Sequence, residues 1–294
     1  MSIPESQLQT WSNIGATDLP QKTHTSIRTA LDSFKGWREP ITYDAYLSGS
    51  YINSTNIHGN SDVDLVVELT SVWYSNLSDS ERQSLKLTDA TYSWDTFRQD
   101  VIAALTQYYG SQYIDTTGKK AIKVLPAPGR QKADVIVSST YRYYEKLRVR
   151  AEGIVLWTQP SRDKIINYPK IHITNGSNKN SDAKTRGWHK RTIRTYKNAR
   201  ERIYVNKPHL KDKFPSYFIE CLLYNVLDRE FGGTYQANFT DTLNWLSSEL
   251  YKDSANDMVC QNEMYYLLRP SLVTWNLADA RLFVSELVEL WNNW

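Results

Sequence analysis

The chain has 294 residues, 40% of them hydrophobic and 23% charged, which excludes wholesale disorder and leaves room for about two domains. No run of about 18 apolar residues occurs and residues 1–30 lack an apolar signal core, so we expect a cytoplasmic protein without a transmembrane helix. The net charge of +3 and the two cysteines do not favour a polynucleotide-binding surface, a disulfide framework or a cysteine zinc site.

The first half of the chain mixes helices and strands. Ile27, Leu31 and Phe34 share one stripe, which predicts a helix over 22–36, and similar apolar spacing predicts a helix over 94–109. Strands are expected over 41–48, 62–69, 119–125, 132–138 and 152–157. Polar stretches separate these elements, over 54–61, 71–90 and 126–131.

The second half of the chain reads as helical. Residues 174–182 are polar and contain a glycine, which predicts a linker. Helices are then expected over 184–204, 215–231, 240–252, 262–268 and 276–293. The sequence therefore predicts an α+β protein with a mixed-sheet domain over 1–170 and a helical domain over 171–294.

Two aspartates head an apolar strand. The strand period of two places Asp62 and Asp64 on one face, while Val63 and Leu65 face a core. Neighbouring carboxylates repel each other unless a cation lies between them, and oxygen ligands select Mg²⁺ or Mn²⁺. Asp134, within a later apolar strand, is the best candidate for a third ligand. Three such acids predict a site for two ions that supports an in-line displacement.

A glycine and a serine follow the preceding strand. Gly49 permits a close backbone approach, and the Ser50 hydroxyl with nearby backbone N–H groups suits a phosphate. Eleven residues separate Ser50 from Asp62. This order, followed by an acid in a later strand, is typical of a nucleotidyltransferase site.

These motifs resemble a known superfamily. Gly-Ser-Tyr from Gly49, Asn53, and Ser-Asp-Val-Asp ending at Asp64 resemble the DNA polymerase β-like nucleotidyltransferases and, within them, the cyclic GMP-AMP synthase-like enzymes of bacterial antiphage defence. Three later blocks are similar to the same enzymes, over 168–180, 191–200 and 214–221. The resemblance implies a bilobal polymerase β-like fold, a mixed sheet with flanking helices plus a helical C-terminal lobe that closes over the nucleotide.

The resemblance also implies roles for single residues. Ser50 would hold a triphosphate oxygen, and Lys197 and Ser216 would reach the terminal phosphates from two helices. Tyr51 would stack on the base. Each has a structural alternative: Lys197 on a solvated basic helix, Ser216 as an N-cap and Tyr51 in a core. His172 is expected to be a structural histidine.

The product depends on which hydroxyl attacks the α-phosphate. Gly-Ser-Tyr and Arg98 on the following helix are similar to the pyrimidine cyclases of the Pycsar defence system. The turn at Asn53 differs from the Arg or Lys with Gly-Thr-Ala that is common in the cyclic dinucleotide synthases. The favoured interpretation is therefore a cyclase that converts UTP or CTP to a 3′,5′-cyclic mononucleotide and pyrophosphate. A cyclic di- or trinucleotide synthase is the alternative, because the same acids serve both reactions.

Other interpretations stay open from the sequence. An inactive nucleotide-binding module is one, although all three acids are present. A transferase acting on an RNA 3′ end or on a small molecule is another. The implied partners are a nucleoside triphosphate and a separate effector that binds the cyclic product; no membrane or nucleic acid is expected, and a homodimer is left open.

Overall fold

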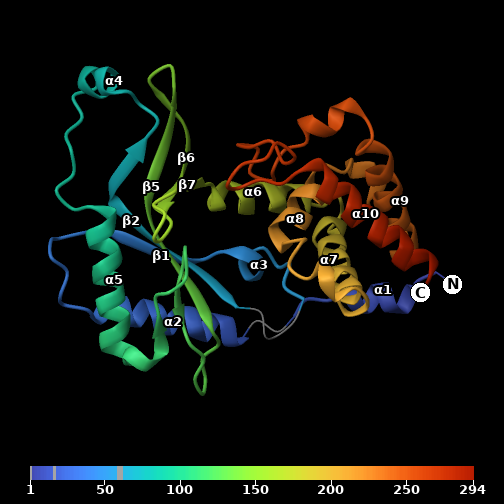
Figure 1. Cartoon of the computed structure of the whole chain (residues 1–294), viewed down its shortest axis with the longest axis horizontal. Coiled ribbons are helices and arrows are strands. Elements are labelled where there is room, and N and C mark those ends of the chain that lie inside the picture. Colours follow the sequence, from blue (N-terminus) through green and yellow to red (C-terminus); the bar gives the residue numbers. More distant parts are fainter. Residues whose placement is uncertain (1, 16–17, 58–61) are drawn as a thin grey trace. The chain divides into compact units, whose positions relative to one another are not determined.

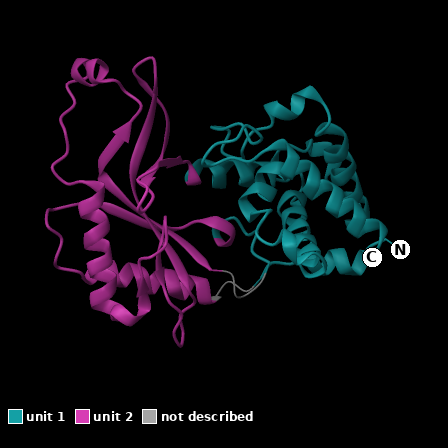
Figure 2. Cartoon of the chain, in the orientation of Figure 1, with its two compact units in different colours: residues 1–15, 52–61, 170–294 teal, residues 16–51, 62–169 magenta. Residues whose placement is uncertain are grey.

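The chain forms two compact units, shown in Figure 2. The computed structural model describes residues 2–15, 18–57 and 62–294, so part of the predicted turn over 54–61 lies outside the described residues. We call the two units the sheet unit (16–51 and 62–169) and the helical unit (1–15, 52–61 and 170–294). The catalytic role expected for residues 1–170 and the nucleotide-closing role expected for residues 171–294 stay predictions.

Within the described residues, seven strands of the sheet unit form one mixed sheet (Figure 1). The strands are β1 (Tyr43–Leu47), β2 (Val63–Ser75), β3 (Ile114–Asp115), β4 (Ile122–Val124), β5 (Ala133–Glu145), β6 (Arg148–Trp157) and β7 (Lys164–Asn167). Their order is β1-β2-β5-β4-β3, with β6 also paired to β5 and β7 to β6. The central β2 and β5 run parallel, and their runs of Val, Leu and Ile are typical of strands buried inside a sheet.

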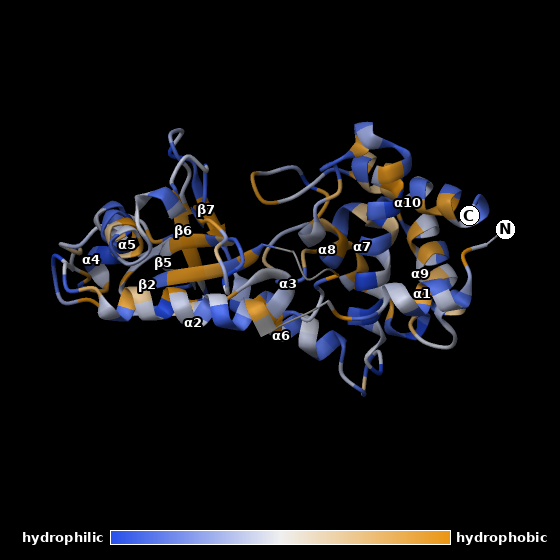
Figure 3. Ribbon diagram, turned by 90° about the horizontal axis from the view of Figure 1, so that it is seen from below, coloured by the Kyte–Doolittle hydropathy of each residue, from blue (hydrophilic) through white to orange (hydrophobic). Residues whose placement is uncertain are grey.

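Two long helices build the hydrophobic core of this unit. They are α2 (Asp18–Ser33) and α5 (Trp94–Tyr109). Their apolar residues share a core with one face of β2 and β5, and Figure 3 shows the apolar character of these strands. The fully buried members include Ile27, Leu31, Phe97, Val101, Val63, Leu65 and Val135. Because strand side chains alternate, the opposite face of β2 and β5 carries Asp64, Glu68 and Asp134 besides the apolar Val66 and Ile136.

The helical unit is an assembly of six longer helices within its described residues. They are α1 (Glu5–Trp11), α6 (Pro169–Lys179), α7 (Trp188–Asn206), α8 (Ser216–Tyr224), α9 (Tyr235–Glu249) and α10 (Leu277–Asn292). Glu5 of α1 accepts hydrogen bonds at 2.7 Å from the backbone N–H groups of Tyr235 and Gln236, which satisfies the N-terminus of α9. None of the helices in the described ranges has the length and apolarity needed to cross a membrane.

Several predicted elements need correction. The linker over 174–182 is wrong, because α6 continues to Lys179. Gly176 lies so close to Gln261 that a Cβ would come within 2.3 Å of its Nε2, so tertiary packing overrides the weak helix propensity of this stretch. The predicted helix over 262–268 is also wrong, because this segment is a loop whose Leu267 is buried in the core.

Three other boundaries differ from expectation. The polar stretch over 71–90 is more regular than predicted, since β2 runs to Ser75 and a capped short helix, α4 (Asp79–Ser84), follows. The helix predicted over 215–231 ends already at Tyr224. The strand predicted over 132–138 is longer than expected, because β5 runs to Glu145. The remaining predicted helices and strands are present, with ends shifted by a few residues, as is usual for helix and strand ends.

Candidate active site

The three predicted metal ligands lie on neighbouring strands of the sheet unit. Asp64 on β2 and Asp134 on β5 are direct partners in the parallel register. Asp62 lies two residues before Asp64, close enough to Asp134 for the two charges to interact. Val63 and Ala133, which alternate with these acids, are fully buried in the core on the other face. The structure therefore places Asp134 on the strand next to Asp64, where a ligand of the same ion can lie.

A short turn brings the Gly-Ser motif against the acids. Helix α3 (Gly49–Ile52) follows β1 directly, and Gly49 has a φ of +65°. A Cβ built on Gly49 would lie 2.1 Å from Oδ2 of Asp64, so only glycine fits this place without a clash. The Ser48 N–H donates to the Asp64 carbonyl at 2.8 Å, and half-buried Ser50 follows on α3. The motif is thus packed around Asp64 by backbone geometry.

Two lysines share the polar environment of the acids. Lys132 donates a hydrogen bond from Nζ to the Asp62 carboxylate, which raises the pKa of the lysine. Burial raises the pKa of Asp134, the positive charges of Lys132 and Lys123 oppose this, and Asp62 adds to it. The site therefore holds one acid in an ion pair and a second in a position that disfavours its charge.

The donor set fits a divalent cation. Oδ1 of Asp134 is buried and has no hydrogen-bond partner among the described residues. Asp64 lies beside it, and carboxylate oxygens are the ligands that Mg²⁺ and Mn²⁺ prefer. In the described ranges, however, no set of three or more His, Cys, Asp or Glu side chains is gathered as a bound metal would need. Asp64 and Asp134 would hold an ion, with Asp62 as the third ligand once it leaves Lys132.

Three further candidates lie in different environments. Tyr51 is 7% exposed and belongs to the hydrophobic core of the sheet unit, which supports packing over base stacking. Asn53 is buried in the helical unit. Arg98 is half-buried on α5; burial lowers its pKa, and its charged neighbours are Asp95 and Arg162. These charged neighbours do not include the three acids, and the nucleotide role of Arg98 stays a prediction.

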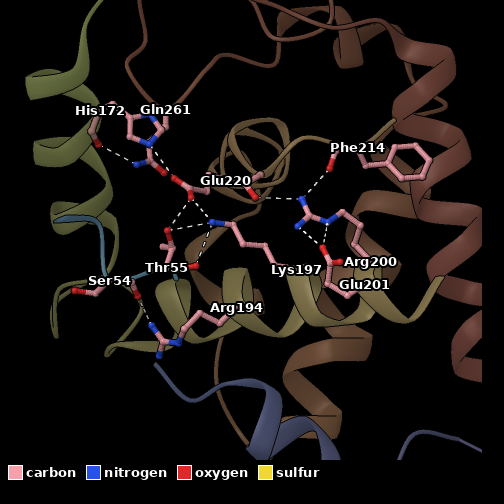
Figure 4. A network of polar contacts seen from close by, with 11 residues as sticks. Ser54, Thr55, His172, Arg194, Lys197, Arg200, Glu201, Phe214, Glu220 and Gln261 are labelled. Atoms are coloured by element: carbon pink, nitrogen blue, oxygen red, sulfur yellow. Dashed lines mark hydrogen bonds and ion pairs between the residues drawn. The ribbon is translucent and has the colours of Figure 1, made fainter. Parts of the chain in front are cut away.

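Lys197 lies inside a buried polar network of the helical unit (Figure 4). Its side chain is 2% exposed, and Nζ donates to Oε1 of Glu220 at 2.5 Å and to the carbonyl and hydroxyl of Thr55 at 3.1 and 3.2 Å. Glu220 also accepts from the Thr55 hydroxyl at 2.7 Å and is bonded to Nε2 of His172 at 3.0 Å. The alternative of a solvated surface lysine is therefore wrong, whereas the structural role expected of His172 is confirmed.

Ser216 opens helix α8 without capping it. The N-cap is Pro215, and Ser216 is the next residue, so the N-cap interpretation of Ser216 is wrong. Arg200 on α7 donates to the Ser216 hydroxyl at 3.1 Å and to the Phe214 carbonyl at 3.0 Å. An arginine and a hydroxyl side by side suit an anion. The phosphate role of Ser216 stays a prediction.

Sequence reasoning missed several residues of this framework. The signal for Lys132 was present, because it lies within the strand predicted over 132–138, two positions before Asp134 and therefore on the same face. Arg194 donates to the carbonyls of Ser12 and Ser54, and so ties two N-terminal segments to α7. No sequence signal identifies such contacts, because Arg194 is separated from these partners by 182 and 140 positions.

A fully buried histidine gives a prediction on pH. Burial lowers the pKa of His189 to about 3, while the unfolded chain titrates near its ordinary value of about 6.5. The stabilisation from neutral His189 is therefore complete above pH 6.5 and is lost as the pH falls toward 3. We expect His189 to reduce the free energy of unfolding by about 1.4 kcal/mol per pH unit in that window.

The measurement is urea unfolding at pH 7, 6 and 5 for the wild type and for His189→Phe, a substitution compatible with the neighbouring Tyr224 and Phe231 rings. Lys179, Glu220, Lys190 and His172 also act on the pKa of His189, and both proteins share these groups. The difference between the two proteins should grow as the pH falls. A constant difference would contradict the buried neutral histidine.

Comparisons with known proteins agree with this architecture. Residues 174–292 match the family of the cGAS/DncV-like nucleotidyltransferase C-terminal helical domain. The chain is 41% identical to the cyclic UMP-AMP synthase of Rhodothermus marinus (strain SG0.5JP17-172), covering 100% of this chain and 99% of that protein. It is 38% identical to the cyclic nucleotide synthase CdnE01 of Staphylococcus haemolyticus, covering 100% of both.

A solved structure extends the similarity to three dimensions. The Rhodothermus marinus CdnE c-UMP-AMP synthase, solved with Apcpp and Upnpp, superposes with a TM-score of 0.91 at 40% identity, covering 99% of this chain and 97% of that one. The match includes the mixed sheet that carries the paired acids as well as the helices. The chain therefore belongs to the cGAS/DncV-like nucleotidyltransferases.

Proposed function

We propose that this protein joins two nucleoside triphosphates, at least one of them a pyrimidine nucleotide, into a cyclic dinucleotide. The observation that supports this most is the full-length similarity, at 41% identity, to a protein named cyclic UMP-AMP synthase. The acids of the sheet unit agree with it, because Asp64 and Asp134 are paired and Asp62 lies beside them.

In each step a ribose hydroxyl oxygen attacks an α-phosphorus. A new P–O bond forms, the bond to the β-phosphate oxygen breaks, pyrophosphate leaves, and the hydroxyl proton passes to a base or to water. Two bound Mg²⁺ or Mn²⁺ ions would neutralise the charge on the reacting phosphates. Asp62, Asp64 and Asp134 would orient these ions, while Gly49 leaves room for the Asp64 carboxylate and Ser50 offers its hydroxyl to a phosphate oxygen.

The product favoured first on sequence grounds, a cyclic mononucleotide, has less support. The Rhodothermus marinus relative is named for a product made from two different nucleotides. Arg98, on which the mononucleotide interpretation partly rested, interacts with Asp95 and Arg162 within the sheet unit. We therefore propose the dinucleotide, which was the alternative interpretation, and keep the mononucleotide as an outcome of the test.

The test is an incubation of the purified protein with ATP, GTP, CTP and UTP, singly and in all pairs, with Mn²⁺ or Mg²⁺. Products are resolved by mass. We expect a cyclic dinucleotide that requires UTP or CTP, and we expect EDTA to stop its formation until a divalent ion is restored. A cyclic mononucleotide from one pyrimidine triphosphate would contradict the proposal, as would synthesis that proceeds with no divalent ion.

The proposal extends to a signalling role in the cytoplasm. A cyclic dinucleotide has no free phosphate monoester and no reactive anhydride, so it suits a messenger better than a metabolic intermediate. A separate effector protein would bind it, in a defence response against phage. Because the effector would bind the cyclic dinucleotide, it can be isolated on a resin to which this product is coupled.

A further inference from the structure

Lys132 lies within the acidic face of the sheet. It immediately precedes β5, two residues before Asp134, so both side chains emerge on the same face. The register of the parallel strands pairs Val63 with Ala133, and this places Lys132 opposite Asp62. Nζ of Lys132 donates a hydrogen bond to the Asp62 carboxylate. A positive charge is therefore held where a metal ligand is expected.

A second lysine on the same face differs in its partner. Lys123 on β4 is the register partner of Asp134. Its ammonium nevertheless lies 3.9 Å from Asp115, at the edge of the sheet, and its side chain is 35% exposed. Lys132 has the same exposure of 35%. The two lysines thus match in charge and exposure, and only Lys132 is hydrogen-bonded to one of the three acids in the described structure.

The ion pair explains why the acids are not gathered for a metal. Within the described residues, no cluster of three or more potential ligands exists, although Asp64 and Asp134 are register partners. Asp62, with a side chain that is 41% exposed, is turned to Lys132. We propose that Lys132 is a built-in counter-ion that holds Asp62 while the site is metal-free and releases this carboxylate when a divalent ion binds.

The exchange is physically inexpensive. Ion pairs between partly exposed groups contribute little net stability, because water and side-chain entropy offset their attraction. A divalent ion attracts a carboxylate twice as strongly as an ammonium at equal distance. The released ammonium can turn to solvent, since Lys132 is not enclosed. Lys132 therefore lowers the affinity of the empty site for metal and keeps three neighbouring carboxylates from repelling each other.

This inference rests on the proposed metal-binding function of the acids, and it is tested without catalysis. Mn²⁺ is titrated into the full-length protein in the absence of nucleotide, and free Mn²⁺ is followed by its electron paramagnetic resonance signal. We expect Lys132→Met to bind the first Mn²⁺ about fivefold more tightly than the wild type, because Asp62 can then ligate the ion without first leaving an ion pair. Lys123→Met should change the affinity much less.

A third comparison isolates the role of Asp62. In an Asp62→Asn background, Lys132→Met should tighten Mn²⁺ binding no more than Lys123→Met does, because no carboxylate remains to be released. Circular dichroism of each variant checks that the fold is retained.

The contrary outcomes separate the two proposals. Equal or weaker Mn²⁺ binding by Lys132→Met, or tightening that persists with Asp62→Asn, overturns the counter-ion role and leaves the proposed function standing. If neither the wild type nor Lys132→Met binds Mn²⁺, both the counter-ion role and the proposed metal-dependent function are overturned.

Discussion

Replacing Asp64 with asparagine is expected to reduce dinucleotide formation by roughly a thousandfold or more, because it removes a charged metal ligand from the reacting phosphates. Asp64 is the register partner of Asp134 and packs against Gly49, so it occupies the centre of the acidic face. Asparagine keeps the size of the side chain. The thermal unfolding midpoint should therefore stay within a few degrees of the wild type, or rise as carboxylate repulsion is relieved.

The measurement is product formed per enzyme with saturating triphosphates and Mn²⁺, alongside a thermal unfolding curve. Glu152→Gln is the matched control, because Glu152 is an acid of the same sheet whose side chain is 56% exposed and pairs with Arg142. The control should retain activity. Synthesis by Asp64→Asn at a tenth of the wild-type rate or faster would sink the assignment of the site.

The second large effect concerns stability in the buried network of the helical unit. Glu220→Gln is expected to lower the free energy of unfolding by about 3–5 kcal/mol, since it leaves the Lys197 ammonium buried without its counter-charge. Burial alone would raise the pKa of Glu220, but Lys197 and His172 outweigh it and hold this pKa well below its usual range. The stabilisation is thus complete above the ordinary carboxyl pKa and is lost as the pH falls below it.

A double-mutant cycle measures this coupling. Lys197→Met should destabilise the protein by a similar amount, and the double variant should cost clearly less than the sum of the single changes. Glu289→Gln is the control, because its ion pair with Lys207 is half exposed and should contribute about 1 kcal/mol or less. Additive single effects would refute the buried pair.

The same variants address the predicted phosphate role of Lys197. If Lys197 also binds the triphosphate, Lys197→Met should weaken nucleotide affinity well beyond Glu220→Gln. Equal affinities in the two variants would limit Lys197 to its contacts with Glu220 and Thr55.

Much of the acidic face was predictable from the sequence because it depends on local rules. The strand period alone placed Asp62 and Asp64 on one face, and the apolar run around Asp134 marked a second central strand. Gly49 was expected to allow a close approach to a phosphate, and the structure shows that it leaves room for the Asp64 carboxylate. The α+β class and the helical second half followed from periodicity in the same way.

What the sequence did not reveal depends on contacts between distant residues. Helix α6 contradicts the propensity of its Asn, Gly and Ser residues, because Gly176 packs against Gln261. The burial of Lys197 required Glu220, 23 positions away, and nothing in either local sequence marks the pair. Tyr51 was assigned equally to a base and to a core, and only the packed structure supports the core. The local sequence pattern predicts which side chains share a face of a strand or helix, whereas the burial of a side chain depends on how the whole unit packs.

The helical unit is assembled from segments that lie far apart in the chain, which affects the order in which the two units can fold during translation. Residues 2–15 pack with helices from 170–294: Leu8 is fully buried, and the Trp11 ring lies 5.4 Å from that of Trp294. Helix α1 precedes the sheet unit in the chain, whereas its packing partners α7 and α9 follow it, after the described strands of the sheet unit are complete. The sheet with its acids can thus fold before α1 finds its partners, and Leu8 stays exposed until α7 and α9 have been synthesised. Nascent chains stalled before α7 should therefore leave Leu8 and Trp11 accessible to chaperones.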